Sequence, residues 1–210
     1  MKIVKKIINK LLNKGFKSDE YWDARYKNGG NSGAGSYSNL AAYKAGFINK
    51  FVLANSIQTV IEFGSGDGNQ LKLANYNSYL GFDVSEEALF ICRNKFFEDK
   101  SKVFKNVSDY VSQQADLSMS LDVIYHLVED SVFESYMKKL FNASKKWVII
   151  YSSNYDGSGS AHVRHRQFID WIATNGHDFS LVVTEKNPFP YSDADPDHTS
   201  LADFYIFARK

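Results

Sequence analysis

The 210-residue sequence predicts an α/β protein, a three-layer α-β-α sandwich built on a seven-stranded, mostly parallel sheet. From residue 57 onward, short apolar runs alternate with segments whose apolar residues recur at helical spacing. Such alternation favours parallel strands covered by helices. The last two apolar runs follow one another with no helix between them, which predicts a terminal antiparallel hairpin at one sheet edge. An N-terminal helical cap precedes this core.

The cap is predicted from the first 56 residues. A basic amphipathic helix over 1–14 lacks the apolar region of a secretory signal and is shorter than the roughly 20 apolar residues of a membrane span. We expect it to dock on the protein's own body or a second subunit, with peripheral membrane association as the alternative. A short aromatic helix (19–26), a Gly-rich loop (28–36) and a longer helix (40–53) follow.

The remaining elements belong to a Rossmann-like core over residues 57–210, which we expect to form one structural unit beside the cap (1–56). Its predicted strands and helices alternate along the chain. The strands are 59–63, 79–82, 103–105, one ending near residue 122, 147–151, 180–185 and 203–208; the helices are 70–75, 86–97, 130–141 and 166–174.

Composition limits the function classes. The chain is 44% hydrophobic and 23% charged with a formal net charge of +1, so neither disorder nor a long-range field for gathering nucleic acid is expected. Cys92 is the single cysteine, which excludes an intramolecular disulfide and a cysteine-based zinc cluster. It favours a reducing compartment, the cytoplasm.

A glycine-rich motif follows the first predicted strand. Glu62 precedes Gly64, Gly66 and Gly68, and small residues there let backbone N–H groups approach a ligand. Asp83 ends the second strand, where a carboxylate can accept both hydroxyls of a ribose. A dinucleotide site would favour G-x-G-x-x-G, whereas here the third glycine comes one residue early. An NAD site and a purely structural turn remain the alternatives.

This order of motifs resembles the class I S-adenosylmethionine-dependent methyltransferases over nearly the whole chain. The resemblance implies S-adenosyl-L-methionine as cofactor and S-adenosyl-L-homocysteine as product. It implies that the cofactor contacts residues of the loop that carries Gly64, Gly66 and Gly68, which we call the glycine loop. It also implies contacts with the ends of the second, third and fourth strands and with the cap. These are Glu62, Gly64, Ser65, Gly66, Asn69, Asp83, Val84, Asn106, Val107, Leu121, Arg25 and Tyr26.

Methyl transfer is an in-line displacement, so such an enzyme mainly aligns the acceptor and excludes water. In this family the acceptor lies beyond the fourth strand, where the sequence places Asp122 and His126. We predict His126 as the base for a hydroxyl acceptor and Asp122 as the group that orients the base or the substrate. Alternatively, His126 satisfies backbone groups or contacts the cofactor.

No metal is expected in the reaction. Asp193, Asp195, Asp197 and His198 are close in sequence but lack the spacing of a known ligand set, so we interpret them as a solvated turn.

A basic run at 162–166 follows the fifth predicted strand and a Gly/Ser-rich loop. Its guanidinium groups suit a phosphate or carboxylate, and cations at a helix N-terminus favour an anion between them and the helix. A solvated helix start is the alternative. The predicted substrate-binding residues are Ser36, Tyr37, Tyr125, Asn154, His162, Arg164, His165 and Arg166.

The acceptor class comes from a second resemblance. The runs 21–26 and 29–37 resemble a bacterial methyltransferase group associated with surface-polysaccharide (capsule or lipopolysaccharide) biosynthesis, although the aromatic residues can equally be core. This implies O-methylation of a small sugar, nucleotide-sugar or phosphorylated precursor, and methylation of a capsular phosphoramidate or phosphate is an alternative. The adenine N-methyltransferase signature is absent after the fourth strand, and no nucleic-acid partner is expected. RNA or protein methylation and a non-catalytic scaffold are alternatives of other classes.

Overall fold

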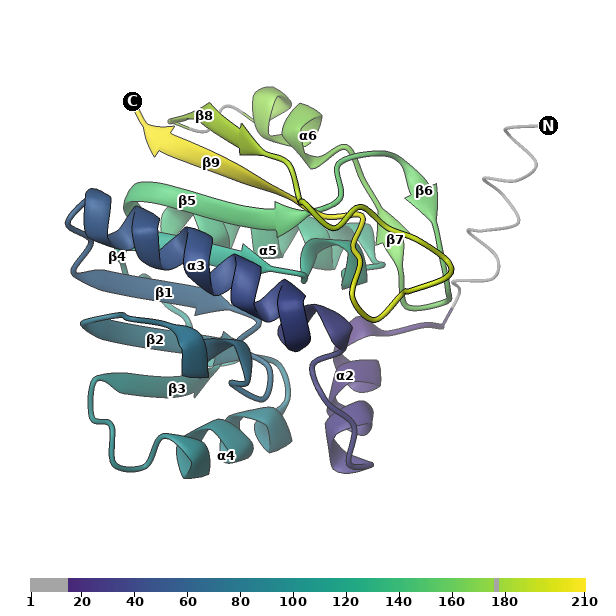
Figure 1. The fold of residues 1–210 in the computed structure, drawn as a ribbon, viewed down its shortest axis with the longest axis horizontal. Helices are drawn as coiled ribbons and strands as arrows, with labels where there is room; N and C mark the ends of the chain where they lie inside the picture. The colour runs from purple at the N-terminus through teal and green to yellow at the C-terminus, as the bar shows by residue number, and fades with distance from the viewer. Residues whose placement is uncertain (1–14, 176–177) are drawn as a thin grey trace.

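The computed structural model describes residues 15–175 and 178–210, so the predicted helix over 1–14 lies outside the described residues. Seven strands form one sheet in the order β3-β2-β1-β4-β5-β9-β8 (Figure 1). The first five strands of that order run parallel, whereas β9 is antiparallel to both of its neighbours. The predicted mostly parallel sheet and its terminal antiparallel hairpin are therefore confirmed. The strands are β1 (Thr59–Phe63), β2 (Ser78–Asp83), β3 (Lys102–Asn106), β4 (Ala115–Leu121), β5 (Ser144–Ser152), β8 (Phe179–Glu185) and β9 (Asp203–Arg209).

Helices cover both faces of this sheet, which confirms the three-layer sandwich. Successive side chains of a strand point to opposite faces, so each face has its own apolar core. One core joins the sheet to α5 and α6, and the other joins it to α3 and α4. The α-helices are α2 (Ser18–Lys27), α3 (Ser38–Ala54), α4 (Glu86–Lys95), α5 (Asp130–Asn142) and α6 (Phe168–Thr174).

Three predicted helices differ from those observed. The segment after the glycine loop forms only a 3-10 helix, η2 (Gln70–Leu73), and α4 ends two residues before position 97. The helix expected from residue 166 begins at Phe168, because the preceding residues form a small hairpin of β6 (Gly157–Ser158) and β7 (Arg164–His165). This hairpin was not predicted, since strands of two residues carry no readable alternation. Across the described residues, no helix has the length and apolar character needed to cross a membrane.

The topology determines where a ligand can bind. β1 lies between β2 and β4, so the chain leaves β1 toward one side of the sheet and later returns to its other side. Open α/β sheets bind ligands beyond the carboxyl ends of the strands at such a switch point. The glycine loop follows β1 there, and Asp122 follows β4.

Candidate functional site

A cavity of about 320 Å³ lies at this switch point. Its volume falls in the range of small-molecule sites, roughly 300–1,000 Å³. Its walls come from the carboxyl ends of β1, β2 and β4, from the cap elements, and from α5. Twelve of the residues predicted to be functional contribute to its lining: Tyr26, Ser36, Glu62, Gly64, Ser65, Gly66, Asp83, Val84, Val107, Leu121, Asp122 and His126.

The glycine loop shapes the cavity floor. Gly64 has a φ of +87° and Gly66 a φ of +55°, a left-handed conformation that glycine adopts without strain. A Cβ at Gly64 would clash with Val123, and one at Gly66 would clash with Ser32. The two glycines are therefore needed both for the turn and for the close approach of two other loops.

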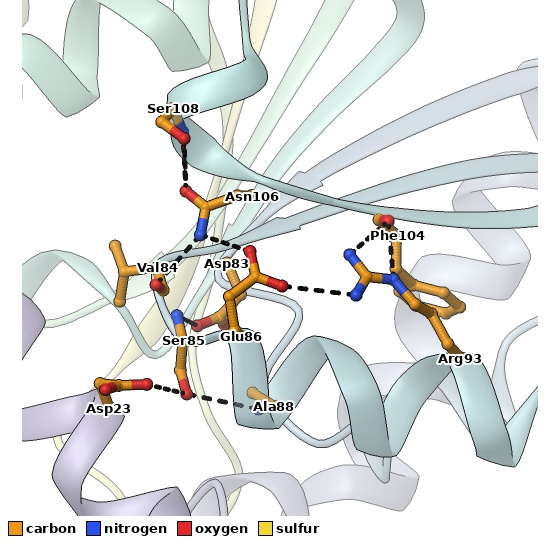
Figure 2. A network of polar contacts seen from close by, with 10 residues as sticks. All are labelled: Asp23, Asp83, Val84, Ser85, Glu86, Ala88, Arg93, Phe104, Asn106 and Ser108. Carbon is orange, nitrogen blue, oxygen red and sulfur yellow. Dashed lines mark hydrogen bonds and ion pairs between the residues drawn. The ribbon is translucent and has the colours of Figure 1, made fainter.

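Asp83 is held at the cavity wall by backbone groups. One carboxylate oxygen accepts a hydrogen bond from the N–H of Gly66 at 2.9 Å, and the other accepts one from Ser85 at 3.0 Å. Figure 2 shows the contacts around it, in which the Ser85 hydroxyl caps α4 and donates to Asp23 of α2. Burial raises the pKa of Asp83. The network joins the cap, the end of β2 and α4 at one point.

Asn106 supports the cavity from outside its lining. Its amide donates to the Glu86 carboxylate at 2.9 Å and to the Val84 carbonyl at 3.3 Å, while its carbonyl oxygen accepts from Ser108 (Figure 2). These bonds connect the loops after β2 and β3. The neighbouring Val107 is the member of the predicted pair that reaches the cavity.

Glu62 and Ser65 are buried polar groups of the lining. Tyr79 donates a hydrogen bond of 2.7 Å to the Glu62 carboxylate, and burial raises the pKa of Glu62 to about 7. The Ser65 hydroxyl oxygen is buried and has no hydrogen-bond partner among the described residues. Because an unsatisfied buried polar atom costs free energy, this hydroxyl fits a site that a ligand completes.

The sequence did not reveal the buried ion pair between Lys44 and Asp122. Lys44 is 0% exposed yet lines the cavity from α3, and its ammonium contacts one oxygen of the Asp122 carboxylate. The Tyr125 hydroxyl donates to the other oxygen at 2.9 Å. Asp122 itself has a φ of +59°, and its N–H donates to the Tyr151 carbonyl. One sequence signal existed, since Lys44 interrupts the apolar stripe of the predicted 40–53 helix.

His126 lies in η4 (Ile124–His126) and faces a backbone carbonyl. Its Nδ1 is 3.0 Å from the carbonyl oxygen of His162, which can only accept, so we assign the proton to Nδ1 and leave Nε2 unprotonated. Burial lowers the pKa of His126 to about 4. Trp22 packs against the imidazole edge-to-face at a centroid distance of 4.8 Å. The carbonyl of His162 therefore orients the imidazole. This is one of the two roles that were predicted for Asp122.

Hydrogen bonds connect the Gly-rich loop of the cap (28–36) to the glycine loop that follows β1. Ser32 exchanges two hydrogen bonds with Asp67, and the Tyr37 hydroxyl donates to the same carboxylate at 2.7 Å. Asn69 donates to the Ser36 carbonyl at 2.8 Å. Tyr37 and Asn69, predicted to bind substrate and cofactor, thus lie outside the lining and hold the loop closed. Arg25 is also outside it and donates to the Asn31 carbonyl.

The two arginines of the basic run lie outside the cavity lining. Both donate to the Val128 carbonyl and form ion pairs with Asp130, and Arg166 also donates to the Leu127 carbonyl. Arg166 is buried, and burial lowers its pKa. In this structure the guanidinium groups stabilise the loop that precedes α5, and no anion is required to satisfy them.

The remaining predicted substrate residues lie outside the cavity lining. Asn154 accepts from the N–H of Ile169 near the start of α6, and His165 forms a hydrogen bond with Ser153. His162 stacks on Tyr21 at a centroid distance of 4.7 Å. Their roles in substrate binding stay predictions.

Sequence reasoning also missed residues of the cap and of α5 that line the cavity. Trp22 belongs to the run of cap aromatics (21–26) that the sequence singled out, but nothing in the sequence indicated that α5 contributes. The added lining residues are Ser18, Asp19, Trp22, Ser32, Lys44, Phe63, Gln70, Phe82, Val123, Leu127, Ser131, Val132, Ser135, Tyr136 and Lys139.

Within 15–175 and 178–210, no three His, Cys, Asp or Glu residues are grouped as a metal site would require.

Comparison with known proteins gives a fold assignment. No protein-family model and no curated protein matches the chain. Magnesium protoporphyrin IX methyltransferase from Synechocystis PCC 6803, solved with bound SAM, is 14% identical with a TM-score of 0.65 over 93% of this chain and 99% of that one. The methyltransferase domain of bacterial CtHen1 is 19% identical, with a TM-score of 0.62 over 79% of this chain and 96% of that one.

A third neighbour is the N-methyltransferase NodS from Bradyrhizobium japonicum WM9 in complex with S-adenosyl-L-homocysteine. It is 13% identical, with a TM-score of 0.62 over 80% of this chain and 86% of its own. The named activities of these neighbours differ, so the likeness does not select an acceptor. The predicted resemblance is confirmed at the level of architecture: the chain has the Rossmann-like fold of the class I S-adenosylmethionine-dependent methyltransferases.

Proposed function

We propose that this protein is a cytoplasmic S-adenosylmethionine-dependent methyltransferase that methylates a hydroxyl group of a small, sugar-containing acceptor. The observation that carries the proposal is the cavity at the switch point, where the glycine loop and Asp83 meet. Structural neighbours with this fold were solved with SAM or S-adenosyl-L-homocysteine bound. The methyltransferase class rests on the site and the fold together.

The chain's residues fit the cofactor in three ways. The left-handed turn at Gly64 and Gly66 keeps the backbone of the cavity floor free of side chains at these two positions, and the Ser65 hydroxyl lacks a partner among the described residues. Asp83 uses one lone pair on each oxygen for backbone N–H groups, which leaves each oxygen able to accept a ribose hydroxyl. Val84 and Val107 supply apolar surface for the adenine. When bound, the cofactor supplies an activated methyl group.

The acceptor side is formed by the cap and the loop after β4. Trp22, Asp122 and His126 line it, and the Gly-rich loop closes against the glycine loop to exclude water. The unprotonated Nε2 of His126 is suited to take a hydroxyl proton as the oxygen attacks. Lys44 and Tyr125 hold Asp122 in place, so its carboxylate orients the acceptor and not the imidazole.

The acceptor class rests on the sequence resemblance to enzymes of bacterial surface-polysaccharide biosynthesis, with Trp22 as an apolar wall suited to a sugar ring. Because Arg164 and Arg166 are engaged by the loop before α5, the proposal does not require a phosphate on the acceptor. This favours hydroxyl methylation over the capsular phosphate alternative. The formal net charge of +1 gives no long-range attraction for RNA.

The first experiment is calorimetric titration with S-adenosyl-L-homocysteine. We expect binding by the native protein and a loss of at least 10-fold in affinity for Asp83→Ala, because hydrogen bonds to a charged group contribute about 1.5–3 kcal/mol each. The matched control is Asp197→Asn, an exposed carboxylate in the loop before β9. Absence of binding by the native protein at millimolar ligand would overturn the methyltransferase proposal.

The second experiment measures transfer of a labelled methyl group to a panel of acceptors. Sugars and nucleotide sugars should be labelled, whereas RNA and proteins should not. Labelling of RNA alone would retain the methyltransferase but overturn the acceptor. Ligand binding without transfer to an extract would favour the scaffold alternative.

A further inference from the structure

The end of β3 offers no free polar side chain to a base bound in the cavity. Under the proposed function, Val84 and Val107 supply apolar surface for the adenine. The amide of Asn106 is engaged by Glu86 and by the Val84 carbonyl, outside the cavity (Figure 2). Apolar walls accept any planar base, and a few placed polar groups give such a pocket its specificity. The groups that distinguish adenine must therefore come from another wall of the cavity.

Helix α2 connects the end of β2 with the start of α5. At its first residue, the Ser18 N–H donates to the Glu129 carboxylate at 2.9 Å, and the Ser18 hydroxyl accepts from the Val128 N–H at 3.1 Å. Five residues later, Asp23 accepts a hydrogen bond from Ser85, which follows the end of β2 (Figure 2). Five residues span about 7.5 Å along a helix axis, so the two walls lie close enough for one base to contact both.

Two serines of α5 line the cavity on this wall. Ser131 and Ser135 are one turn apart on the same face of the helix, and their side chains are exposed to solvent. Neither hydroxyl has a hydrogen-bond partner in the part of the chain that the structure describes. Val107 packs against the apolar core that contains Tyr136, the residue after Ser135, so the serines and the apolar wall belong to one region.

The edge of adenine requires a group that can accept a hydrogen bond. Its N6 amino group donates, whereas the ring nitrogens beside it accept. A hydroxyl can do both, but the ammonium of Lys139, one turn beyond Ser135 on the same face, can only donate. Tyr136 also lines the cavity, yet its hydroxyl already donates to the Phe63 carbonyl at 2.8 Å. Ser131 and Ser135 are therefore the groups of α5 that match this edge.

We propose that Ser131 and Ser135 bind the edge of the cofactor's adenine, so that specificity for the base comes from α5 and not from the end of β3. One hydroxyl accepts a hydrogen bond from the N6 amino group, and the other donates to a neighbouring ring nitrogen. The assignment rests on the proposed function, because it places residues within the proposed cofactor site. It concerns which base is bound and leaves the residues of the acceptor side unchanged.

Calorimetric titration of the full chain with two ligands tests the assignment. One ligand is S-adenosyl-L-homocysteine, and the other is its 6-H purine analogue, which lacks only the N6 amino group. The native protein should bind the analogue about 5- to 10-fold more weakly, because it loses one neutral hydrogen bond. The variant with Ser131→Ala and Ser135→Ala should bind the two ligands within about 2-fold of each other, since it has no hydroxyl left to accept from the amino group. Alanine favours helix more than serine does, so α5 should stay intact.

The matched control is Ser112→Ala, the same change at an exposed serine in the loop before β4, which should keep the native preference. A native protein that binds both ligands equally, or a double serine variant that keeps the native preference, would overturn the assignment while the proposed function stands. Loss of the preference in Ser112→Ala would also overturn it. A native protein that binds neither ligand would overturn the assignment and the proposed function together.

Discussion

Lys44 and Asp122 form a buried ion pair beside the cavity. Removing one partner leaves the charge of the other uncompensated. Lys44→Met leaves the Asp122 carboxylate, whose side chain is only 10% exposed, without its cation. Breaking such a pair destabilises a protein by about 3–5 kcal/mol, whereas replacing both charges is often neutral. We expect Lys44→Met to lower the free energy of unfolding by about 3 kcal/mol, measured by urea denaturation.

The double variant Lys44→Met with Asp122→Asn is the control for this prediction. Asparagine tolerates the left-handed backbone of position 122 and still accepts from Tyr125. Most of the lost stability should return. If the double variant is no more stable than Lys44→Met, the pair does not act as one unit.

His126 is predicted to act as a base with an unusually low pKa. His126→Asn keeps a donor for the His162 carbonyl but removes the basic nitrogen, so kcat should fall about 100- to 10,000-fold while the affinity for S-adenosyl-L-homocysteine is retained. His198→Asn is the control, because that histidine is exposed in the loop before β9. Unchanged turnover in His126→Asn would assign His126 a structural role.

The pH dependence of the native protein gives a second readout of His126. Its pKa of about 4 in the folded protein lies below the ordinary value of 6.5, so folding favours the neutral ring. Its contribution to stability is complete above about pH 6.5 and is lost as the pH falls toward 4. The acid limb of kcat/KM should lie near pH 4 and not near 6.5, so a limb near 6.5 would contradict the assignment.

At the scale of elements, the cap loop depends on one carboxylate. Burial raises the pKa of Asp67, but hydrogen bonds from Tyr37, Asn69 and Ser32 outweigh burial and lower it. Asp67→Ala removes the acceptor for these groups and weakens the attachment of the loop, which keeps only the hydrogen bonds from the Asp67 N–H to Ser32 and from Asn69 to the Ser36 carbonyl. We expect S-adenosyl-L-homocysteine to dissociate about 10-fold faster, measured by stopped-flow tryptophan fluorescence. Glu98→Ala, at an exposed position after α4, should leave the rate unchanged.

Periodicity and motif order were sufficient to predict the sheet, its terminal hairpin and the glycine loop, because those features depend on local sequence. The partners of side chains were not predictable in the same way. Arg164 and Arg166 have the composition of an anion site, yet carbonyls of a loop nearly 40 positions earlier satisfy them. Lys44 and Asp122 lie 78 positions apart, and only packing of α3 on the sheet brings them together.

At the scale of the whole molecule, we propose that the core supplies the cofactor side of the site and that the cap supplies much of the acceptor side. Neighbours with the same fold include a porphyrin methyltransferase and the small RNA methyltransferase HEN1. Shared architecture therefore does not select an acceptor, and we propose that the surrounding loops determine it. In this chain those loops include residues 28–36 and the segment between β5 and α6.

The cap is predicted to be inseparable from the core, although the sequence divides them at residue 56. Ile48 and Val52 of α3 belong to the apolar core on one face of the sheet, and Lys44 neutralises Asp122. A fragment of residues 57–210 would expose the apolar side chains of that face and lose the Lys44 partner of Asp122, so it should show no cooperative thermal transition. A fragment of residues 15–210 keeps all of these contacts and should melt cooperatively, near the temperature of the full chain. Circular dichroism measures both, and cooperative melting of the shorter fragment would show that the core folds alone.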